Sequence, residues 1–301
     1  MADITLRQPE PERIVRAADD DALIDLWLER KPMGTRSGYS TDIIEFRDFV
    51  RVQLRRLTLN DLFDFAAYLS KREVGEGERR RKLSIGTQQR KLSAVKSLLT
   101  FGHKTGYLPL NVGAALDLPK KKNDLANRIL TEEDIVRMIT LEPNPRNQLL
   151  IRLMYVSGGR VSEVVGAAWR DLQERETGGQ ITLFGKGGKT RAVLLPEKTW
   201  RDLQAMRNEA SETDPLFISE KGSRLSRSQA WRIVKAAAKR AGVNWDASPH
   251  WFRHSHASHA IERGAKLPVV RDTLGHASLS VTNQYIHARP EESSSEHLVI
   301  Q

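Results

Sequence analysis

One stretch near the end of the chain constrains the fold most, because it begins a helix and places reactive side chains on it. Ser248 followed by Pro249 is typical of a helix start, with serine at the N-cap and proline at the first helical position. His250 and Arg253 are three residues apart, so a helix places both side chains on one face. The pattern predicts a helix that continues to about Gly264, where glycine favours a C-terminal stop.

Two more short helices are predicted directly after this one. Pro268 suits the first turn of a helix that Gly275 ends. Ser278 is the expected N-cap of the next helix, which carries Tyr285, and His276 lies between the two. A histidine and an arginine on one helix face are more often a solvated surface. Here, however, a guanidinium, two imidazoles and a phenol fall within one stretch, and such groups can bind a phosphodiester and attack it.

The overall charge favours a polyanionic partner. The chain of 301 residues has a net charge of +10 and a sequence pI near 9.9. No run approaches the roughly 18 apolar residues of a membrane span, so nucleic acid is favoured over a membrane. The absence of cysteine excludes thiol catalysis and zinc–thiolate sites and fits a reducing cytoplasm. The first twenty residues are acidic and lack the apolar segment of a signal peptide.

The length predicts two domains, since a chain of this size exceeds what one small core usually takes. The best linker begins at Leu118, because it is basic, contains proline and lacks apolar periodicity. Residues 51–125 hold 16 Lys and Arg against 7 Asp and Glu, so most of the positive field belongs to the first half. We predict a flexible N-terminal segment at 1–18, a helical DNA-binding domain at 19–117, a linker at 118–128, a catalytic domain at 129–290 and a tail at 291–301.

Apolar periodicity predicts four helices in the first domain. They cover 20–30, 40–53, 58–69 and 85–105, and a flexible basic connection is expected at 75–82. The last helix is long enough, at ~1.5 Å per residue, to cross a groove of DNA. Cations on a helix often only solvate it, but the basic cluster before this one favours DNA contact. The candidate DNA contacts are Arg79, Arg80, Arg81, Lys82, Arg90, Lys91, Lys96, Lys120, Lys121 and Lys122, with the three on the long helix expected at its surface.

The second domain is predicted to be mainly helical with one β-hairpin. The expected helices begin at Thr131, cover 148–156 after breaks at Pro143 and Pro145, begin again at Val161, and cover 197–207 and 226–241. Residues 180–184 and 190–195 alternate with a period of two, which predicts strands joined by the glycine-rich turn 185–189. A phosphate-binding P-loop is excluded, because Leu183 occupies a required glycine position and a strand follows instead of a helix. A lysine at the tip of a rigid hairpin remains.

Together these groups resemble the signature of the tyrosine recombinases, the phage integrase family. The first two matching motifs are Gly158-Gly159-Arg160-Val161-Ser162-Glu163, similar to the family's first arginine box, and Gly185-Lys186-Gly187, similar to its hairpin lysine. The other two are His250-Trp251-Phe252-Arg253-His254, similar to the second box, and Leu274-Gly275-His276 with Tyr285, similar to the nucleophile region. The resemblance covers roughly residues 20–290. One departure is Gly159, where members usually have an apolar residue, and it is expected to loosen that turn.

The resemblance implies a fold and a set of catalytic residues. The implied fold is mainly α, with a helical, SAM-like core-binding domain and a mainly helical catalytic domain that includes a small β-hairpin or sheet, as in DNA breaking-rejoining enzymes. The implied roles are phosphate binding by Arg160 and Arg253, a hydrogen bond to the phosphate from His276, general base for His250, general acid for Lys186 and nucleophile for Tyr285. Glu163 is expected to orient one of these groups.

The implied activity is site-specific recombination of duplex DNA through a 3′-phosphotyrosyl intermediate, without metal or ATP. The implied partners are a duplex with a specific recombination site and a tetramer on two duplexes, formed by this chain alone or with a related recombinase. A cytoplasmic, nucleoid-associated location follows. The histidine-rich run from His250 to His259 does not favour a metal site, because these two residues point to opposite helix faces and no acidic ligand is interleaved.

Two alternative functions stay open. One is a type IB topoisomerase, which relaxes DNA with the same nucleophile, and the other is a non-catalytic DNA-binding protein that retains the fold. We expect no additional domain before residue 20, which favours a simple, Xer-like recombinase. The apolar residues 298–300 follow a polar spacer and are expected to fold back onto their own domain or to dock on a neighbouring protomer.

Overall fold

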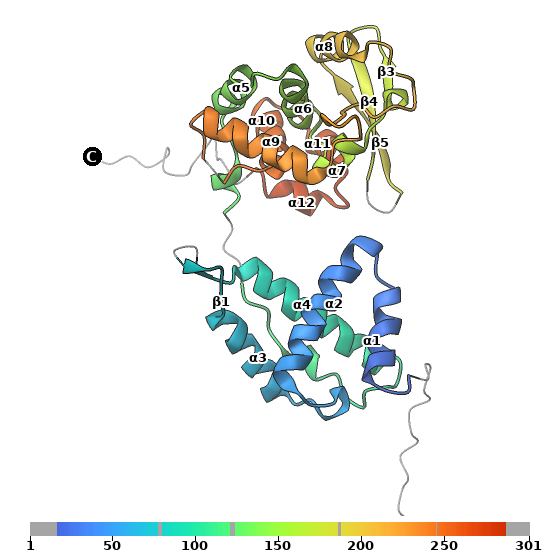
Figure 1. Cartoon of the computed structure of the whole chain (residues 1–301), viewed down its shortest axis with the longest axis vertical. Helices are drawn as coiled ribbons and strands as arrows, with labels where there is room; N and C mark the ends of the chain where they lie inside the picture. Colours follow the sequence, from blue (N-terminus) through green and yellow to red (C-terminus); the bar gives the residue numbers. More distant parts are fainter. Residues whose placement is uncertain (1–16, 78–79, 121–123, 186–187, 245, 287–301) are drawn as a thin grey trace, which may run out of the picture. The chain divides into compact units, whose positions relative to one another are not determined.

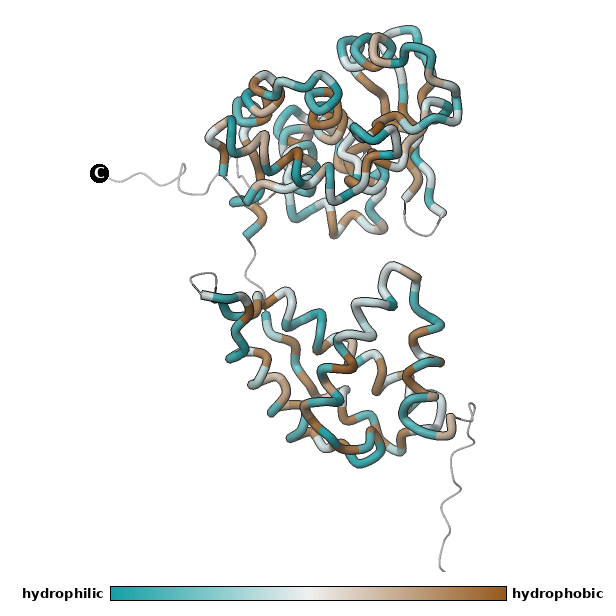
Figure 2. Tube along the Cα trace, viewed as in Figure 1, coloured by the Kyte–Doolittle hydropathy of each residue, from teal (hydrophilic) through white to brown (hydrophobic). Residues whose placement is uncertain are grey.

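The computed structural model describes residues 17–77, 80–120, 124–185, 188–244 and 246–286. The chain divides into two compact units, residues 1–122 and 123–301, which are described separately. Figure 2 shows hydrophobic and hydrophilic stretches alternating along the helices of both units, as amphipathic helices around a core require. No helix among the described residues is both long and apolar enough to cross a membrane. The predicted tail lies outside the described residues.

In its described part, the first unit has four α-helices and a small hairpin (Figure 1). These elements are α1 (Asp20–Glu29), α2 (Met33–Val50), α3 (Leu59–Lys71), α4 (Ile85–Lys104), β1 (Glu73–Val74) and β2 (Arg81–Lys82). Asp19, Thr58 and Ser84 cap α1, α3 and α4, because each side chain accepts a hydrogen bond from the backbone N–H three residues on. The helices enclose a core that includes the fully buried rings of Trp27 and Phe46.

Helix α2 begins at Met33, earlier than the predicted start at residue 40. Arg36 explains the early start, because its guanidinium donates hydrogen bonds to the carbonyl oxygens of Glu29 and Lys31, at 2.7 and 2.9 Å. These two carbonyls lie at the end of α1, so the contacts tie the first turn of α2 to the preceding helix.

The predicted flexible connection at 75–82 ends instead in a paired strand. Strands β1 and β2 are antiparallel, with Glu73 opposite Lys82 and Val74 opposite Arg81. Gly75 has a φ of 95°, a left-handed conformation that favours glycine and allows the turn. The strand pairing therefore fixes the backbone of Arg81 and Lys82, whose side chains are exposed.

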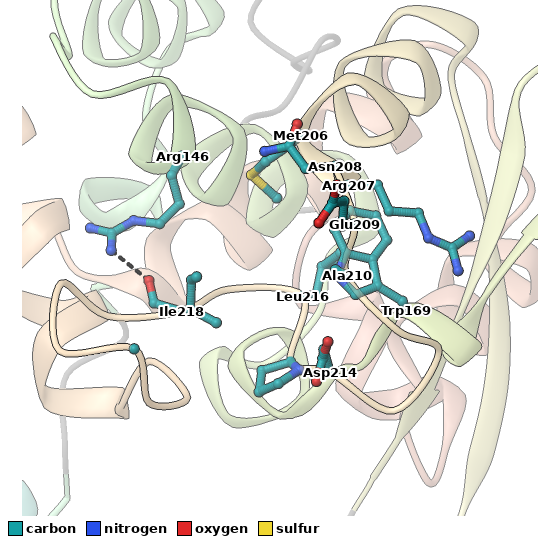
Figure 3. A pocket seen from close by; sticks show the side chains of 12 residues that line it. Arg146, Trp169, Met206, Arg207, Asn208, Glu209, Ala210, Asp214, Leu216 and Ile218 are labelled. Atoms are coloured by element: carbon teal, nitrogen blue, oxygen red, sulfur yellow. Dashed lines mark hydrogen bonds between the residues drawn. The ribbon is translucent and has the colours of Figure 1, made fainter.

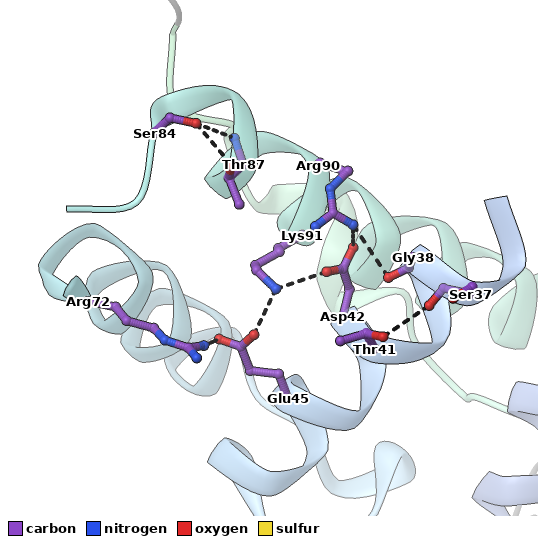
Figure 4. A network of polar contacts seen from close by, with 10 residues as sticks. All are labelled: Ser37, Gly38, Thr41, Asp42, Glu45, Arg72, Ser84, Thr87, Arg90 and Lys91. Atoms are coloured by element: carbon purple, nitrogen blue, oxygen red, sulfur yellow. Dashed lines mark hydrogen bonds and ion pairs between the residues drawn. The ribbon is translucent and has the colours of Figure 1, made fainter. Parts of the chain in front are cut away.

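A buried ion-pair network joins α2, α3 and α4 (Figure 4). Lys91 lies on α4, and its ammonium is 2.9 Å from a carboxylate oxygen of Asp42 and 2.7 Å from one of Glu45. Arg90 also pairs with Asp42, and Arg72 pairs with Glu45. The side chain of Asp42 is fully buried and that of Lys91 is 8% exposed. The expectation that Lys91 lies on the helix surface is therefore wrong, because the buried carboxylate of Asp42 and the half-buried one of Glu45 draw its ammonium inward.

In its described part, the second unit has eight α-helices beside a three-stranded antiparallel sheet (Figure 1). The helices are α5 (Glu132–Thr140), α6 (Pro145–Ser157), α7 (Val161–Gly166), α8 (Glu197–Arg207), α9 (Arg227–Arg240), α10 (Pro249–Glu262), α11 (Leu267–Leu274) and α12 (Leu279–Asn283). The strands are β3 (Leu172–Glu174), β4 (Gly179–Phe184) and β5 (Thr190–Leu195), in the order β3-β4-β5. This mainly helical fold with small antiparallel sheets confirms the predicted fold class.

Three local details of the second unit differ from the predictions. Pro145 does not break a helix but opens α6 at its first position, where its missing N–H costs nothing. Strand β3 was not predicted, because three residues are too few to show an alternating pattern. Tyr285 lies two residues beyond the end of α12, in a turn in which its N–H donates to the carbonyl oxygen of Thr282.

Two clusters of buried side chains organise the second unit. The larger one is formed by α5 to α10 and the inward faces of β4 and β5, and includes Leu150, Ile181 and Phe252. A smaller cluster lies apart from it and contains Tyr285. Its members are Leu125, Ala257, Val270, Leu274 and Tyr285.

Candidate active site

The turn between α6 and α7 places Arg160 at the start of α7. Gly158 has a φ of 56°, and a Cβ there would lie 2.7 Å from the side chain of Leu274. A Cβ on Gly159 would lie 2.8 Å from Val164. Both distances are shorter than normal contacts, so the turn packs too closely for larger side chains. The departure at Gly159 therefore does not loosen the turn in this chain.

A buried carboxylate holds two guanidiniums side by side. Glu163 accepts from Nη1 of Arg160 at 2.8 Å and from Nη2 of Arg191 at 2.7 Å, and its side chain is 2% exposed. Burial acts to raise the pKa of Glu163, but the hydrogen bonds from Arg191 and Arg160 outweigh it and hold the pKa below its ordinary value. Arg191 also donates from Nε to the carbonyl oxygen of Thr273 at 2.6 Å. The ionised Glu163 thus orients Arg160, and Arg191 joins the sheet to α11.

Arg253 connects two distant segments of the site. It lies on α10, is buried, and donates to the carbonyl oxygens of Gly158 at 2.9 Å and Leu274 at 2.7 Å. Burial, followed by the nearby Arg160 and Arg191, lowers the pKa of Arg253 to about 10, so the guanidinium stays charged at neutral pH. One side chain therefore fixes the turn before Arg160 against the end of α11.

The two predicted catalytic histidines are held differently. His250 is exposed at the start of α10, where partial desolvation, then Arg253 and Arg160, lower its pKa. His276 follows α11, and its Nδ1 is 2.9 Å from the hydroxyl oxygen of Thr282. Desolvation, then the same two arginines, lower the pKa of His276 to about 4. Both imidazoles therefore stay neutral at pH 7, where each can donate one hydrogen bond and accept another.

Tyr285 is packed between two histidines and is 3% exposed. Its ring stacks on that of His276, with centroids 6.3 Å apart and planes 4° from parallel. Its hydroxyl oxygen is 2.9 Å from Nδ1 of His254. Burial raises the pKa of Tyr285, although Arg253 and a hydrogen bond from Gln284 act to lower it. The phenol is therefore protonated at neutral pH.

A cationic pocket of about 530 Å³ lies beside these residues. It is lined by Arg160, Gly185, Lys189, Thr190, Arg191, Asp272, Gly275, His276 and Ala277. The acid of this set, Asp272, pairs with Arg271 at 2.6 Å, which offsets its charge. Several cations around an open pocket suit a phosphate group.

A second cavity of about 570 Å³ lies elsewhere on the same unit (Figure 3). Trp169, Met206 and Leu216 line it, and Arg146 donates across one side to the carbonyl oxygen of Ile218 at 2.6 Å. The predicted catalytic residues do not line it. Its size alone therefore does not make it the reaction site.

The structure places five of the six predicted catalytic residues on neighbouring segments, namely Arg160, His250, Arg253, His276 and Tyr285. Lys186 lies outside the described residues. Sequence reasoning missed His254 as a contact of Tyr285, although it directly follows Arg253 in the quoted motif. It also missed Arg191, whose position next to the hairpin turn was the available signal. The histidine-rich part of α10 forms no metal-binding group, and none is found among the other described residues.

The predicted DNA contacts also have different surroundings. Arg80, Arg81, Lys82 and Lys120 are exposed, and Arg80 pairs loosely with Glu73 at 3.1 Å. Lys96 donates to the carbonyl oxygen of Leu116. Arg79, Lys121 and Lys122 lie outside the described residues.

Comparison with known proteins identifies the family. The model of the phage integrase family matches residues 128–292. The tyrosine recombinase XerD of Bifidobacterium longum is 31% identical over 294 residues, which cover 89% of this chain and 92% of the relative. The XerD protein of Neisseria meningitidis serogroup B is 33% identical over 281 residues, with the same two coverages.

Solved structures show the same fold at lower identity. The XerH site-specific recombinase bound to a palindromic difH substrate, in a post-cleavage complex, has a TM-score of 0.74 at 20% identity and covers 93% of this chain and 84% of that one. A lambda integrase tetramer bound to a Holliday junction has a TM-score of 0.71 at 17% identity, with coverages of 93% and 81%. The chain therefore belongs to the phage integrase family, that of the tyrosine site-specific recombinases.

Proposed function

We propose that this recombinase cleaves duplex DNA with Tyr285 and rejoins it without a metal ion or ATP. The observation that supports this is the assembly around Arg253, which fixes the turn before Arg160 against the helix end before His276. The phenol oxygen attacks the phosphorus, the 5′-oxygen of the next nucleotide leaves, and a 3′-phosphotyrosyl bond forms. One phosphoester replaces another, so the bond is available for the reverse attack by a 5′-hydroxyl.

Each proposed role matches the chemistry of the side chain. The pentavalent transition state gains negative charge on its non-bridging oxygens, which the planar guanidiniums of Arg160 and Arg253 are suited to bind. His276 is neutral and partly buried, and its proposed role is to donate a hydrogen bond to the same phosphate. His250 assists in removing the phenol proton, and Lys186 protonates the departing 5′-oxygen.

Fewer cations of the first unit are proposed to contact DNA than the sequence predicted. Arg81 and Lys82 on β2 are exposed, and with Arg80 and Lys120 they can bind phosphates along a duplex. Arg79, Lys121 and Lys122 are neighbours of these residues in sequence and belong to the same proposal. Lys91 is omitted, because two carboxylates already hold its ammonium. Arg90 and Lys96 contact both protein and solvent and stay secondary candidates.

We further propose that four protomers act on two duplexes that each carry a specific recombination site. Support comes from a solved relative, the lambda integrase tetramer described as bound to a Holliday junction. The four protomers are copies of this chain or include a related recombinase. Because the proposed substrate is DNA, we propose that the protein acts in the cytoplasm at the nucleoid.

The decisive experiment is covalent trapping on a nicked suicide substrate that carries the recombination site of the host. Wild-type protein should form a DNA adduct, and Tyr285→Phe should bind the same DNA with similar affinity and form none. The exposed Tyr68→Phe variant is the matched control and should behave as wild type. An adduct that persists in Tyr285→Phe would disprove the assignment. Strand exchange between two labelled duplexes, as opposed to relaxation of a supercoiled plasmid, separates recombination from topoisomerase activity.

A further inference from the structure

The side chain of Tyr285 is packed as a core residue rather than presented at the cationic pocket. It is 3% exposed and belongs to the small buried cluster with Leu125, Val270 and Leu274. The pocket is lined by Arg160 and His276 but not by Tyr285. A nucleophile has to come within about 3–3.5 Å of the atom that it attacks. The hydroxyl of Tyr285 must therefore leave its present position before it can reach a phosphate in that pocket.

One histidine contacts the reacting oxygen itself. Nδ1 of His254 is 2.9 Å from the hydroxyl oxygen of Tyr285, within the range of a normal hydrogen bond. The other ring beside Tyr285 belongs to His276, whose Nδ1 is already engaged by the hydroxyl of Thr282. His276 therefore packs against the face of the phenol, whereas His254 binds its polar end.

The pKa shifts show that this hydrogen bond joins two neutral groups. Burial, then His250, Arg128 and Arg253, lower the pKa of His254 to about 4, although Asp124 acts to raise it. Burial raises the pKa of Tyr285. A neutral imidazole and a neutral phenol therefore face each other, and they share one hydrogen bond whose donor is set by the tautomer of His254. So weakly basic an imidazole stabilises the phenol and is a poor acceptor for complete proton transfer.

We propose that His254 is a positioning residue that holds the hydroxyl of Tyr285 in a resting site away from the phosphate pocket, and that this contact must break before attack. The inference rests on the proposed role of Tyr285 as nucleophile. His254 thereby restrains the nucleophile until a cleavable phosphate is bound. Contacts with the bound phosphate then compensate for the lost hydrogen bond between His254 and Tyr285.

Leu125 belongs to the same buried cluster as Tyr285. It lies two residues after the boundary at which the second unit begins. Asp124 and Arg128 lie on either side of Leu125 in sequence and pair with each other at 2.6 Å. Arg128 acts to lower the pKa of His254, and Asp124 acts to raise it. The chain that enters the second unit therefore forms part of the site that retains the nucleophile.

The test is single-turnover adduct formation by the full-length protein on a nicked suicide substrate. His254→Leu keeps a side chain of similar size and removes the hydrogen-bonding ring nitrogen, so we expect adduct formation to be about 3- to 10-fold faster, the factor for one ordinary hydrogen bond. His254→Asn is the matched control, because its amide can replace Nδ1 as donor or acceptor, and it should keep close to the wild-type rate. Leu125→Ala opens the site independently and should also accelerate the reaction.

The outcomes separate this inference from the proposed function. Faster adduct formation by His254→Leu and Leu125→Ala, at unchanged DNA affinity, supports the resting site. A slower reaction of folded His254→Leu would instead make His254 a proton acceptor in the reaction and overturn the proposal, as would an unchanged rate. If His254→Leu fails to fold, the rate of Leu125→Ala decides by the same criterion. Absence of an adduct with wild-type protein, by contrast, would contradict the role of Tyr285 itself.

Discussion

The two units each contain a cluster of partly buried charges, and the clusters differ in how the charges are balanced. In the first unit, Lys91, Arg90 and Arg72 all face one of two carboxylates, those of Asp42 and Glu45. This cluster is satisfied by the protein alone, and it holds three helices together.

The second cluster is short of negative charge. Glu163 alone serves both Arg160 and Arg191, and the partners described for Arg253 are the neutral carbonyls of Gly158 and Leu274. In the proposed function, a phosphodiester supplies the negative charge that this cluster lacks. The comparison favours a functional role for a buried cation whose charge is left for a ligand to neutralise.

The largest effect is expected when the shape of a guanidinium is changed and its charge is kept. Arg160→Lys and Arg253→Lys should each lower single-turnover cleavage by about 10²–10³-fold, because an ammonium cannot bind two phosphate oxygens in one plane. DNA affinity should change little. Arg201→Lys, at an exposed position on α8, is the control and should cleave as wild type. If both Lys variants cleave within a few-fold of wild type, these arginines do not bind the reacting phosphate.

A smaller effect, on stability rather than on cleavage, is expected in the first unit. Lys91→Met should lower the free energy of unfolding of this unit by about 3 kcal/mol, because it leaves buried carboxylates partly uncompensated. Arg90 and Arg72 still pair with them and limit the loss. Urea-dependent hydrogen exchange of peptides from this unit measures the change, with the exposed Lys71→Met as control. Unchanged stability combined with weaker DNA binding would show that Lys91 contacts DNA after all.

The smallest effect concerns the pH dependence of the second unit. The pKa of Glu163 is lowered in the folded chain, so its contribution to stability is fully present above the unfolded pKa of ~4.3. That contribution is lost as pH falls through the lower folded pKa. Glu163→Gln should therefore destabilise the unit at pH 7 and progressively less below pH ~4, as measured by denaturant unfolding. A difference between variant and wild type that is constant with pH would show that the carboxylate charge is not responsible.

Local signals predicted much of the fold. The helix starts at Ser84 and Thr131 were predictable because each cap depends on residues within three positions. The short strands β1, β2 and β3 were missed because two or three residues are too few to show a period, and their pairing forms only in the folded chain.

The sequence predicted five described residues that lie together in the candidate site, but it did not predict how deeply each of them is buried. The spacing of His250 and Arg253 indicates a shared helix face, yet His250 is exposed and Arg253 is buried. Depth depends on the segments that cover the helix, here the turn at Gly158 and the end of α11. The contact between His254 and Tyr285 joins residues 31 positions apart, so no local pattern encodes it.

The two carbonyl contacts of Arg253 also determine when, during synthesis of the chain, the candidate site can assemble. Its partners are 95 residues earlier and 21 residues later in the chain. A polypeptide still emerging from the ribosome exposes the cations of its first unit long before this bridge is complete. A product that stops before Leu274 keeps those cations but has neither the complete bridge nor the proposed nucleophile, so it can bind DNA without cleaving it.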